Sequence, residues 1–174
     1  MEQKLRTPIS DDIRTSLVAG TEVLITGTIY TGRDTAHKNM TEAVKKKQDL
    51  PFDFVGQIIY YVGPTPPKPG QAIGACGPTS SYRLDKYSPT LMKQGLKVMI
   101  GKGERSEVMR QEIKKNQGVY LLAVGGLGAL LSKTVQSSEI IAYPELGTEA
   151  IRKLEVVNFP AIVAIDSKGN TVFK

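Results

Sequence analysis

Short apolar runs alternate along the chain with segments in which apolar residues recur every three or four positions. The runs at 21–30, "TEVLITGTIY", and at 56–64, "GQIIYYVGP", are rich in β-branched and aromatic residues and predict strands. The clearest helical pattern is 106–118, "SEVMRQEIKKNQG", in which Ser106 is a suitable N-cap and Gly118 a suitable stop. This alternation of strands and helices predicts an α/β fold.

The same pattern indicates where the other elements lie. Val108, Met109 and Ile113 are apolar and are expected to share one side of the helix at 106–118. The proline- and glycine-rich segment at 63–71 cannot extend a sheet and is expected to be a surface loop. The remaining predictions are helical patterns at 31–48, 88–95 and 126–134, and strands within 96–106, 119–126, 137–147 and 153–173, the last with a turn at 167–170.

Length and composition fit one folded domain. The 174 residues are enough for one well-buried core, and 40% hydrophobic with 23% charged residues is typical of a folded soluble protein. Because the ends of the chain are strand-rich while strands and helices alternate in the middle, we predict a single α/β domain with a mixed sheet over 1–174.

The formal net charge is +6, and much of it is diffuse. Lys45, Lys46 and Lys47 end a helical pattern, where positive charge complements the helix dipole and forms a solvated face. No aromatic and basic stacking pattern accompanies the charge, so we predict no nucleic-acid partner.

Cysteine usage and the first residues bear on the compartment. Cys76 is alone, so it can form neither an internal disulfide nor a multi-cysteine metal site, which agrees with a reducing compartment. The opening "MEQKLRTPIS" lacks the order of a signal peptide, and no apolar run approaches the length that spans a bilayer. We therefore expect a cytoplasmic protein with no membrane partner.

Three junctions place glycine beside cationic or hydroxyl residues: "TGRDTAH", "CGPTSSYR" and "GKGERS". Loops after strands are where α/β folds usually bind ligands. In the first junction Arg33 stands at a helix start, where the dipole disfavours a cation, so an anion should hold it: Asp34 or another acid, or a ligand carboxylate or phosphate. His37 follows four residues later on the same helical face, and a lone histidine is more often structural than catalytic.

In the second junction Thr79 and Arg83 are four residues apart, so a helix that begins near Thr79 would present both on one side. The alternative is an ordinary N-cap at Thr79, Ser80 or Ser81, with Cys76 as a small core residue. In the third junction Lys102 lies between two glycines, but the spacing of a phosphate-binding loop is absent.

Arg33, Arg83 and Lys102 supply three cations on three glycine-rich turns, with the Thr79 hydroxyl nearby if the turns converge. Such a cluster suits a small dicarboxylate, because arginine grips a carboxylate through two hydrogen bonds and lysine stabilises developing charge. "VGGLGALL" also lacks the dinucleotide-binding spacing, so nucleotide binding is set aside. The sequence offers no metal ligand set and no nucleophile–base pair, so the chain is expected to supply only half of an active site.

The blocks "TGTIYTGRDTAHK", "GPTSSYRLD", "GKGERS", "YPELGTEAI" and "VVNFPAIVAIDSKGN", in that order, resemble the β subunit, or C-terminal domain, of class I iron-sulfur fumarate hydratases. The resemblance implies a swivelling β/β/α domain that packs against a larger α subunit. It also implies that three cysteines of the α subunit hold a four-iron four-sulfur cluster, so that this chain binds no metal. The implied reaction is the reversible hydration of fumarate to L-malate, at a site shared between the chains of a higher-order heteromer.

Carried over by motif, the resemblance implies that Arg33, Arg83 and Lys102 bind substrate oxygens and that Thr79 takes the C3 proton of malate. A threonine hydroxyl is a poor base unless a cation or a hydrogen-bond relay lowers its pKa, and Arg83 is suited to that task. Asp34 and His37 are expected to orient Arg33.

Two alternatives stay open. One is the L(+)-tartrate dehydratase β subunit, whose blocks are similar; "GRDTAH" and "GKGERS" resemble the fumarase versions more, although Ser80 stands where fumarases often have a second threonine. The other is a non-catalytic module that binds small dicarboxylates. A basic nucleic-acid-binding domain is a more remote third reading, which predicts strongly salt-dependent binding.

Overall fold

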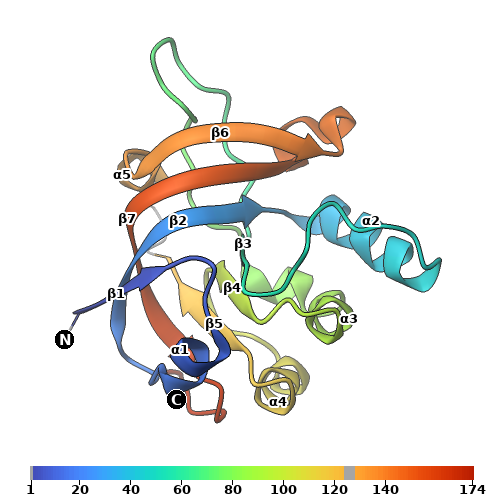
Figure 1. Ribbon diagram of the computed structural model, residues 1–174, viewed down its shortest axis with the longest axis vertical. Helices are drawn as coiled ribbons and strands as arrows, with labels where there is room; N and C mark the ends of the chain where they lie inside the picture. The colour runs from blue at the N-terminus through green and yellow to red at the C-terminus, as the bar shows by residue number, and fades with distance from the viewer. Residues whose placement is uncertain (1, 124–127) are drawn as a thin grey trace.

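The computed structural model describes residues 2–123 and 128–174 of the chain, and its strands form one sheet that folds back on itself. Strand β2 (Glu22–Thr31) pairs antiparallel with β7 (Ile151–Ile165), the longest strand. Strand β1 (Glu2–Arg6) joins β2 in parallel, and β6 (Val135–Ala142) joins β7 antiparallel. These four strands form the broad curved layer in Figure 1.

The second β layer is a short parallel sheet of β3 (Ile58–Tyr60), β4 (Val98–Gly101) and β5 (Val119–Leu122). It joins the first layer at both sides, because β3 pairs with the end of β2 and β5 pairs with the end of β7. The strands β2, β3, β4, β5 and β7 therefore form a closed ring.

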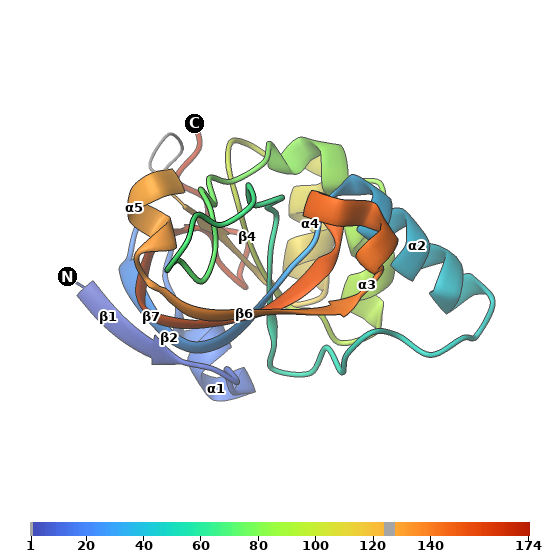
Figure 2. The ribbon, with the colours of Figure 1, turned by 90° about the horizontal axis from the view of Figure 1, so that it is seen from above.

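Helices cover the outer face of the parallel sheet. Figures 1 and 2 show α2 (Asp34–Lys45), α3 (Ser88–Lys93) and α4 (Glu107–Lys115) gathered on that side. The shorter elements are α1 (Asp11–Ser16), α5 (Gly128–Ser132) and the 3₁₀ helices η1 (Ser81–Leu84) and η2 (Pro144–Glu149). The order of layers is β/β/α, which confirms the predicted α/β class with a mixed sheet.

Alternation along the parallel strands divides the interior into two cores, because successive side chains of a strand point to opposite faces. Ile58 and Tyr60 of β3 face the core between the two β layers, whereas Ile59 faces the core under the helices. In β4, Ile100 and Met99 divide in the same way. Burial on both faces explains why these strands are continuous apolar runs in the sequence.

Most predicted elements are confirmed, with shifted bounds. The 63–71 loop is exposed over most of its length and projects from the body in Figure 1, and Ser106 caps α4 by accepting a hydrogen bond from the Met109 amide. The predicted strand at 119–126 is present to Leu122, and its part at 124–126, like the first residues of the helix predicted at 126–134, lies outside the described residues.

Three expectations require correction or addition. Val108 is 73% exposed, so only Met109 and Ile113 hold α4 to the core. After the turn at 167–170 the chain forms an isolated bridge rather than a second strand. Strand β1 and helix α1 lie in the first twenty residues, for which the sequence pattern predicted no element, because both are short and largely polar.

Candidate functional site

The three glycine-rich junctions meet at one edge of the sheet. Strands β2, β3 and β4 are mutually parallel, so their carboxyl ends lie side by side. Arg33 follows the end of β2, and Lys102 follows the end of β4. Thr79 joins them because its amide donates to the Tyr61 carbonyl, directly after β3, at 2.8 Å. The convergence on which the sequence prediction depended is therefore present.

Backbone pairing fixes the second junction against the third. Ser80 and Lys102 form a parallel bridge, and the Ser81 amide donates to the Lys102 carbonyl at 2.9 Å. The Lys102 amide donates in turn to Ser81 Oγ at 3.0 Å. Thr79 is half-buried and Lys102 is exposed. These contacts place the backbones of Thr79 and Lys102 on adjacent segments.

The helix assumed to carry Thr79 begins later than predicted. The 3₁₀ helix η1 starts at Ser81, with Ser80 as its N-cap and no side-chain capping bond. Thr79 and Arg83 are therefore not presented one turn apart on a single helix. Thr79 is instead held by the sheet edge and Arg83 by η1, because the "TSS" segment pairs with the Lys102 loop before the chain turns.

Arg33 occupies the N-cap position of α2, and its side chain makes no capping hydrogen bond there. Glu149 Oε1 of η2 accepts from the Thr35 amide at 3.3 Å and so satisfies one of the free amides of the first turn. The Arg33 side chain crosses Gly63, where an added Cβ would lie 2.7 Å from Arg33 Cδ. Position 63 therefore needs to be glycine for Arg33 to keep this path.

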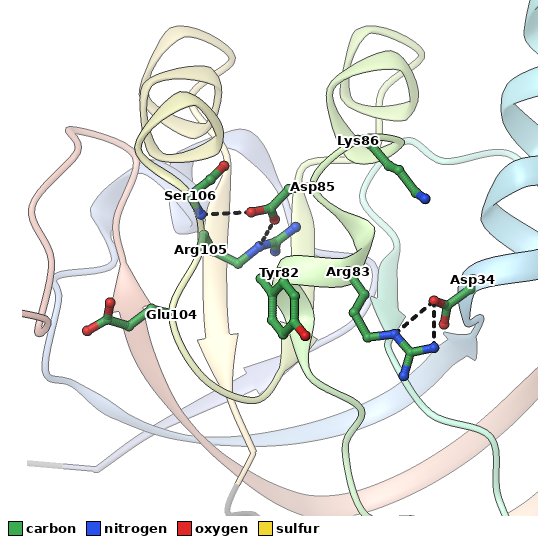
Figure 3. Close-up of a pocket in the computed structure, with 8 residues that line it drawn as sticks. All are labelled: Asp34, Tyr82, Arg83, Asp85, Lys86, Glu104, Arg105 and Ser106. Carbon is green, nitrogen blue, oxygen red and sulfur yellow. Dashed lines mark hydrogen bonds and ion pairs between the residues drawn. The ribbon is translucent and has the colours of Figure 1, made fainter.

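Asp34 lies between two arginines, as Figure 3 shows for the Arg83 side. Arg83 donates to Asp34 Oδ2 through Nε at 3.0 Å and through Nη2 at 2.9 Å. Arg33 Nε is 3.8 Å from Asp34 Oδ1, and within the described residues neither of these two buried atoms has a hydrogen-bond partner. Asp34 thus gathers Arg33 and Arg83 into one cationic group.

An open pocket of about 730 Å³ adjoins this group. It is lined by Asp34, Tyr82, Arg83, Asp85, Lys86, Glu104, Arg105 and Ser106, drawn in Figure 3. Of the predicted site residues, Asp34 and Arg83 line the pocket, while Arg33, His37, Thr79 and Lys102 lie outside its lining. The hollow is therefore only part of the predicted site: outside it Lys102 is exposed, Arg33 and Thr79 are half-buried, and His37 is buried.

His37 is completely buried behind Arg33. Its Nδ1 is 2.7 Å from the Arg33 carbonyl oxygen, and its ring meets Tyr61 edge-on with centroids 5.3 Å apart. Burial, only partly offset by the bond to the Arg33 carbonyl, lowers the pKa of His37 from 6.5 to about 4. At neutral pH the ring is therefore uncharged and Nδ1 carries the proton that it donates to Arg33.

A buried ion pair in the wall of the pocket was not anticipated from the sequence. Arg105 has a fully buried side chain, and its Nε donates to Asp85 Oδ1 at 2.5 Å. Asp85 Oδ2 accepts from the Ser106 amide at 2.7 Å, and the guanidinium lies 5.2 Å and 4.9 Å from the ring centres of Tyr61 and Tyr120. No sequence signal identified Arg105, since a charged residue in a glycine-rich loop is normally exposed.

The described residues do not fit a metal or iron-sulfur ligand set. No group of three histidine, cysteine or acidic side chains gathers in the ranges 2–123 and 128–174. Cys76 is buried, and burial raises the pKa of its thiol to about 12, so it is protonated at neutral pH rather than a thiolate ligand.

The fold and this edge together define a class: a β/β/α domain that presents two arginines, a lysine and a threonine at the carboxyl ends of its parallel strands. A family profile described as "Fumarase C-terminus" matches residues 2–174, and the chain belongs to this family. The family expected from the sequence blocks is thereby confirmed.

Several curated proteins are similar to the chain. It is 41% identical over 156 residues to "Fumarate hydratase class I, aerobic" of Escherichia coli (strain K12), which covers 88% of this chain and 28% of the relative. It is 37% identical over 174 residues to "Fumarate hydratase 2" of Leishmania major, covering 97% of the chain and 30% of the relative. The chain thus spans less than a third of the length of these fumarate hydratases.

A different relative matches the chain at nearly full length. The "Putative L(+)-tartrate dehydratase subunit beta" of Methanocaldococcus jannaschii is 35% identical over 180 residues, covering 100% of the chain and 92% of the relative. Within the described residues, none of the helices has the length and apolar character needed to cross a membrane.

Proposed function

We propose that this chain forms one wall of a hydro-lyase site that interconverts fumarate and L-malate, the other wall belonging to an α subunit. The observation that carries the proposal is the convergence of Arg33, Arg83, Thr79 and Lys102 at one sheet edge in a member of the fumarase C-terminus family. The edge supplies cations that suit the substrate but, in the described residues, no metal-ligand group, which supports a site completed by a partner.

The cations of this edge suit the two carboxylates of the substrate. Arg83 uses Nε and Nη2 on Asp34, which leaves its other terminal nitrogen outside the pair, beside the open pocket. Arg33 enters from α2, and the exposed Lys102 side chain forms no ion pair within the described part of the chain. We assign Arg33, Arg83 and Lys102 to substrate oxygens, because paired arginines bind carboxylates with defined geometry.

Thr79 is assigned the proton transfer at C3. In dehydration a base removes the C3 proton of malate, the electron pair of that C–H bond forms the double bond, and the C2–O bond breaks. The departing hydroxyl takes up one proton and the base releases its own, so that one water is lost overall, and hydration is the reverse. A threonine alkoxide forms only beside positive charge, and the cationic edge provides such surroundings. Asp34 and His37 are assigned the orientation of Arg33, the former through its carboxylate and the latter through the Arg33 carbonyl.

The four-iron four-sulfur cluster expected for the complete enzyme is assigned to the α subunit. The single buried thiol of Cys76 and the lack of a ligand group in the described residues support this assignment. The match to a protein named as a subunit beta over 92% of its length supports a separate β chain in a heteromer. We place this heteromer in the cytoplasm.

The test is anaerobic co-expression with the cysteine-bearing subunit encoded in the same genome, followed by cluster reconstitution. Malate and tartrate dehydration are measured with each subunit alone and with both. Turnover of malate only when both are present supports the proposal. Turnover of tartrate instead would assign the chain to the tartrate dehydratases, which the M. jannaschii relative makes the second candidate. Silence on both, with retained dicarboxylate binding, would indicate a non-catalytic binding module.

Thr79→Ala then tests the base. We expect turnover of the assembled enzyme to fall by about 10²-fold or more with a small change in KM, since a proton-transfer group acts in the transition state. Wild-type turnover in this variant would remove Thr79 from the chemistry.

A further inference from the structure

A buried pair of hydroxyls lies beneath the Lys102 loop and has no assigned role. Tyr120 Oη is 2.7 Å from Ser81 Oγ and 2.7 Å from the Gly103 carbonyl oxygen. Ser81 Oγ also accepts from the Lys102 amide at 3.0 Å. Both side chains are completely buried. One side chain of β5 and one of η1 therefore hold both sides of the peptide segment that carries Lys102.

The bonds around Ser81 form a closed set. Tyr120 has one proton, which it donates to the Gly103 carbonyl, while the Ser81 hydroxyl bonds to Tyr120 Oη and accepts from the Lys102 amide. The Ser81 amide donates to the Lys102 carbonyl at 2.9 Å. Three polar groups of the 102–103 loop are thus satisfied by two residues that lie outside it.

The fit of this arrangement is tight. A Cβ added to Gly101 would collide with the Ser81 side-chain oxygen and would lie 2.8 Å from Tyr61 Cδ2. The Tyr120 ring is itself fixed by the Arg105 guanidinium, 4.9 Å from its centre, which Asp85 anchors. The loop tip, by contrast, is open, since nothing lies within 4 Å of a Cβ built on Gly103. Rigidity therefore comes from beneath the loop and not from its surroundings.

We propose that Ser81 and Tyr120 are positioning residues that hold Lys102 in register with Thr79. The inference rests on the proposed function, in which these two residues act on the same substrate molecule. Thr79 and Lys102 lie on different segments, and the bridge between Ser80, the residue next to Ser81, and Lys102 is the backbone link between them. We call the hydrogen bonds of Ser81 and Tyr120 to the 102–103 loop the clamp. Loss of the clamp would free the Lys102 side of that backbone link.

The first experiment measures the clamp without requiring any activity. Amide hydrogen exchange of the full chain is followed at Lys102 in wild type and in Tyr120→Phe, which removes one oxygen and keeps the ring. We expect exchange at Lys102 to accelerate by about tenfold, as loss of a buried hydrogen bond predicts. Unchanged protection at Lys102 would overturn the clamp.

Tyr60→Phe is the matched control. Tyr60 is equally buried on β3, a strand of the same parallel sheet, and its hydroxyl donates to a backbone carbonyl, that of Cys76. It therefore loses a comparable hydrogen bond away from the Lys102 loop, and exchange at Lys102 should stay within about twofold of wild type. Equal acceleration in both variants would mean that any lost buried hydroxyl loosens the loop, and would overturn a specific clamp.

The second experiment measures function in the assembled heteromer. We expect Tyr120→Phe and Ser81→Ala each to lower malate turnover by about 10- to 100-fold, as misplacement of a binding group predicts, and the double variant to cost no more than the worse single one. Turnover within twofold of wild type, with accelerated exchange at Lys102, would overturn the positioning role. If the wild-type heteromer itself lacks hydro-lyase activity, the proposed function fails while the exchange measurement still decides whether the clamp exists.

Discussion

Two arginine–carboxylate pairs lie within the same pocket wall and differ in almost everything except their chemistry. Arg105 and Asp85 are 0% and 11% exposed at their side chains, whereas Arg83 and Asp34 are 45% and 27% exposed. Arg105 also meets Tyr61 Oη and Ser88 Oγ, each at 3.3 Å, and lies over two aromatic rings. Arg83 has Asp34 as its hydrogen-bonding partner and otherwise faces the open pocket.

The difference teaches which charges are available for a ligand. A guanidinium surrounded by protein partners cannot turn to a substrate without leaving a buried charge, so Arg105 belongs to the framework. A guanidinium held at one edge by an acid can still bind a carboxylate with its other edge. The local sequence alone does not show which of the two arginines is buried, because each stands in a glycine-rich block beside hydroxyl residues.

The strongest way to break this comparison is Asp85→Asn. The variant leaves Arg105 buried without a counter-charge, so we expect the free energy of unfolding to fall by about 3–5 kcal/mol. Urea unfolding of the full chain measures it. A decrease in the free energy of unfolding below about 1 kcal/mol would mean that the pair of Arg105 and Asp85 contributes no more than an ordinary surface ion pair.

His37 sharpens the comparison because it contacts both regions, the Arg33 carbonyl on one side and the Tyr61 ring on the other. The histidine titrates near pH 6.5 in the unfolded chain and near pH 4 when folded, chiefly because burial disfavours the charged ring. Below about pH 6.5 the unfolded chain binds a proton that the folded chain cannot, so stability falls as the pH drops toward 4, by roughly 3 kcal/mol from this residue.

His37→Gln removes that acid-dependent loss while retaining an N–H for the Arg33 carbonyl. Denaturant unfolding at a series of pH values between 7 and 4.5 should therefore give a flatter acid limb for the variant than for wild type. Parallel pH curves for the two proteins would mean that His37 does not titrate as its burial requires.

Arg83→Lys probes the open pair. Lysine retains the charge but not the planar fork, so we expect KM of the assembled enzyme to rise by about tenfold or more. Stability should change by less than about 0.5 kcal/mol, since the side chain is partly exposed. An unchanged KM would remove Arg83 from the substrate.

The smallest effect is expected for Asp34→Asn, the matched counterpart of Asp85→Asn. The partly exposed pair with Arg83 should contribute about 0–1 kcal/mol to the free energy of unfolding. The same urea titration measures it. A loss of stability as large as that of Asp85→Asn would mean that both ion pairs stabilise the fold to the same extent, and would contradict the distinction between a structural pair and a ligand-binding pair.

The sequence predicted the sheet edge better than the contacts behind it. Strands such as 21–30 are long enough for their pattern to be unambiguous. The glycine-rich turns after the strands, singled out for Arg33 and Lys102 on the condition that they converge, lie at one edge of the sheet. The start of η1 was misplaced by two residues, because each of the three residues in "TSS" can cap a helix. The bridge between Ser80 and Lys102, a tertiary contact, determines where the helix begins.

Burial was the quantity that local pattern could not supply. Residue type predicts the wrong burial for both Val108 and Arg105. Val108 is apolar but exposed, and Arg105 is charged but has a buried side chain. The enclosure of Arg105 depends on Asp85, Tyr61 and Tyr120, which come from three other segments. No window around position 105 contains that information.

The closed ring of strands has a consequence for synthesis on the ribosome. Strand β7 pairs with β2, β5 and β6, and it supplies Leu154, Phe159 and Val163 to the core between the two β layers. Translation reaches β7 after every other strand, so until residues 151–165 leave the exit tunnel β2 and β5 present unpaired edges. The nascent chain therefore depends on delayed, long-range closure, the stage at which chaperone protection against edge-to-edge aggregation counts most.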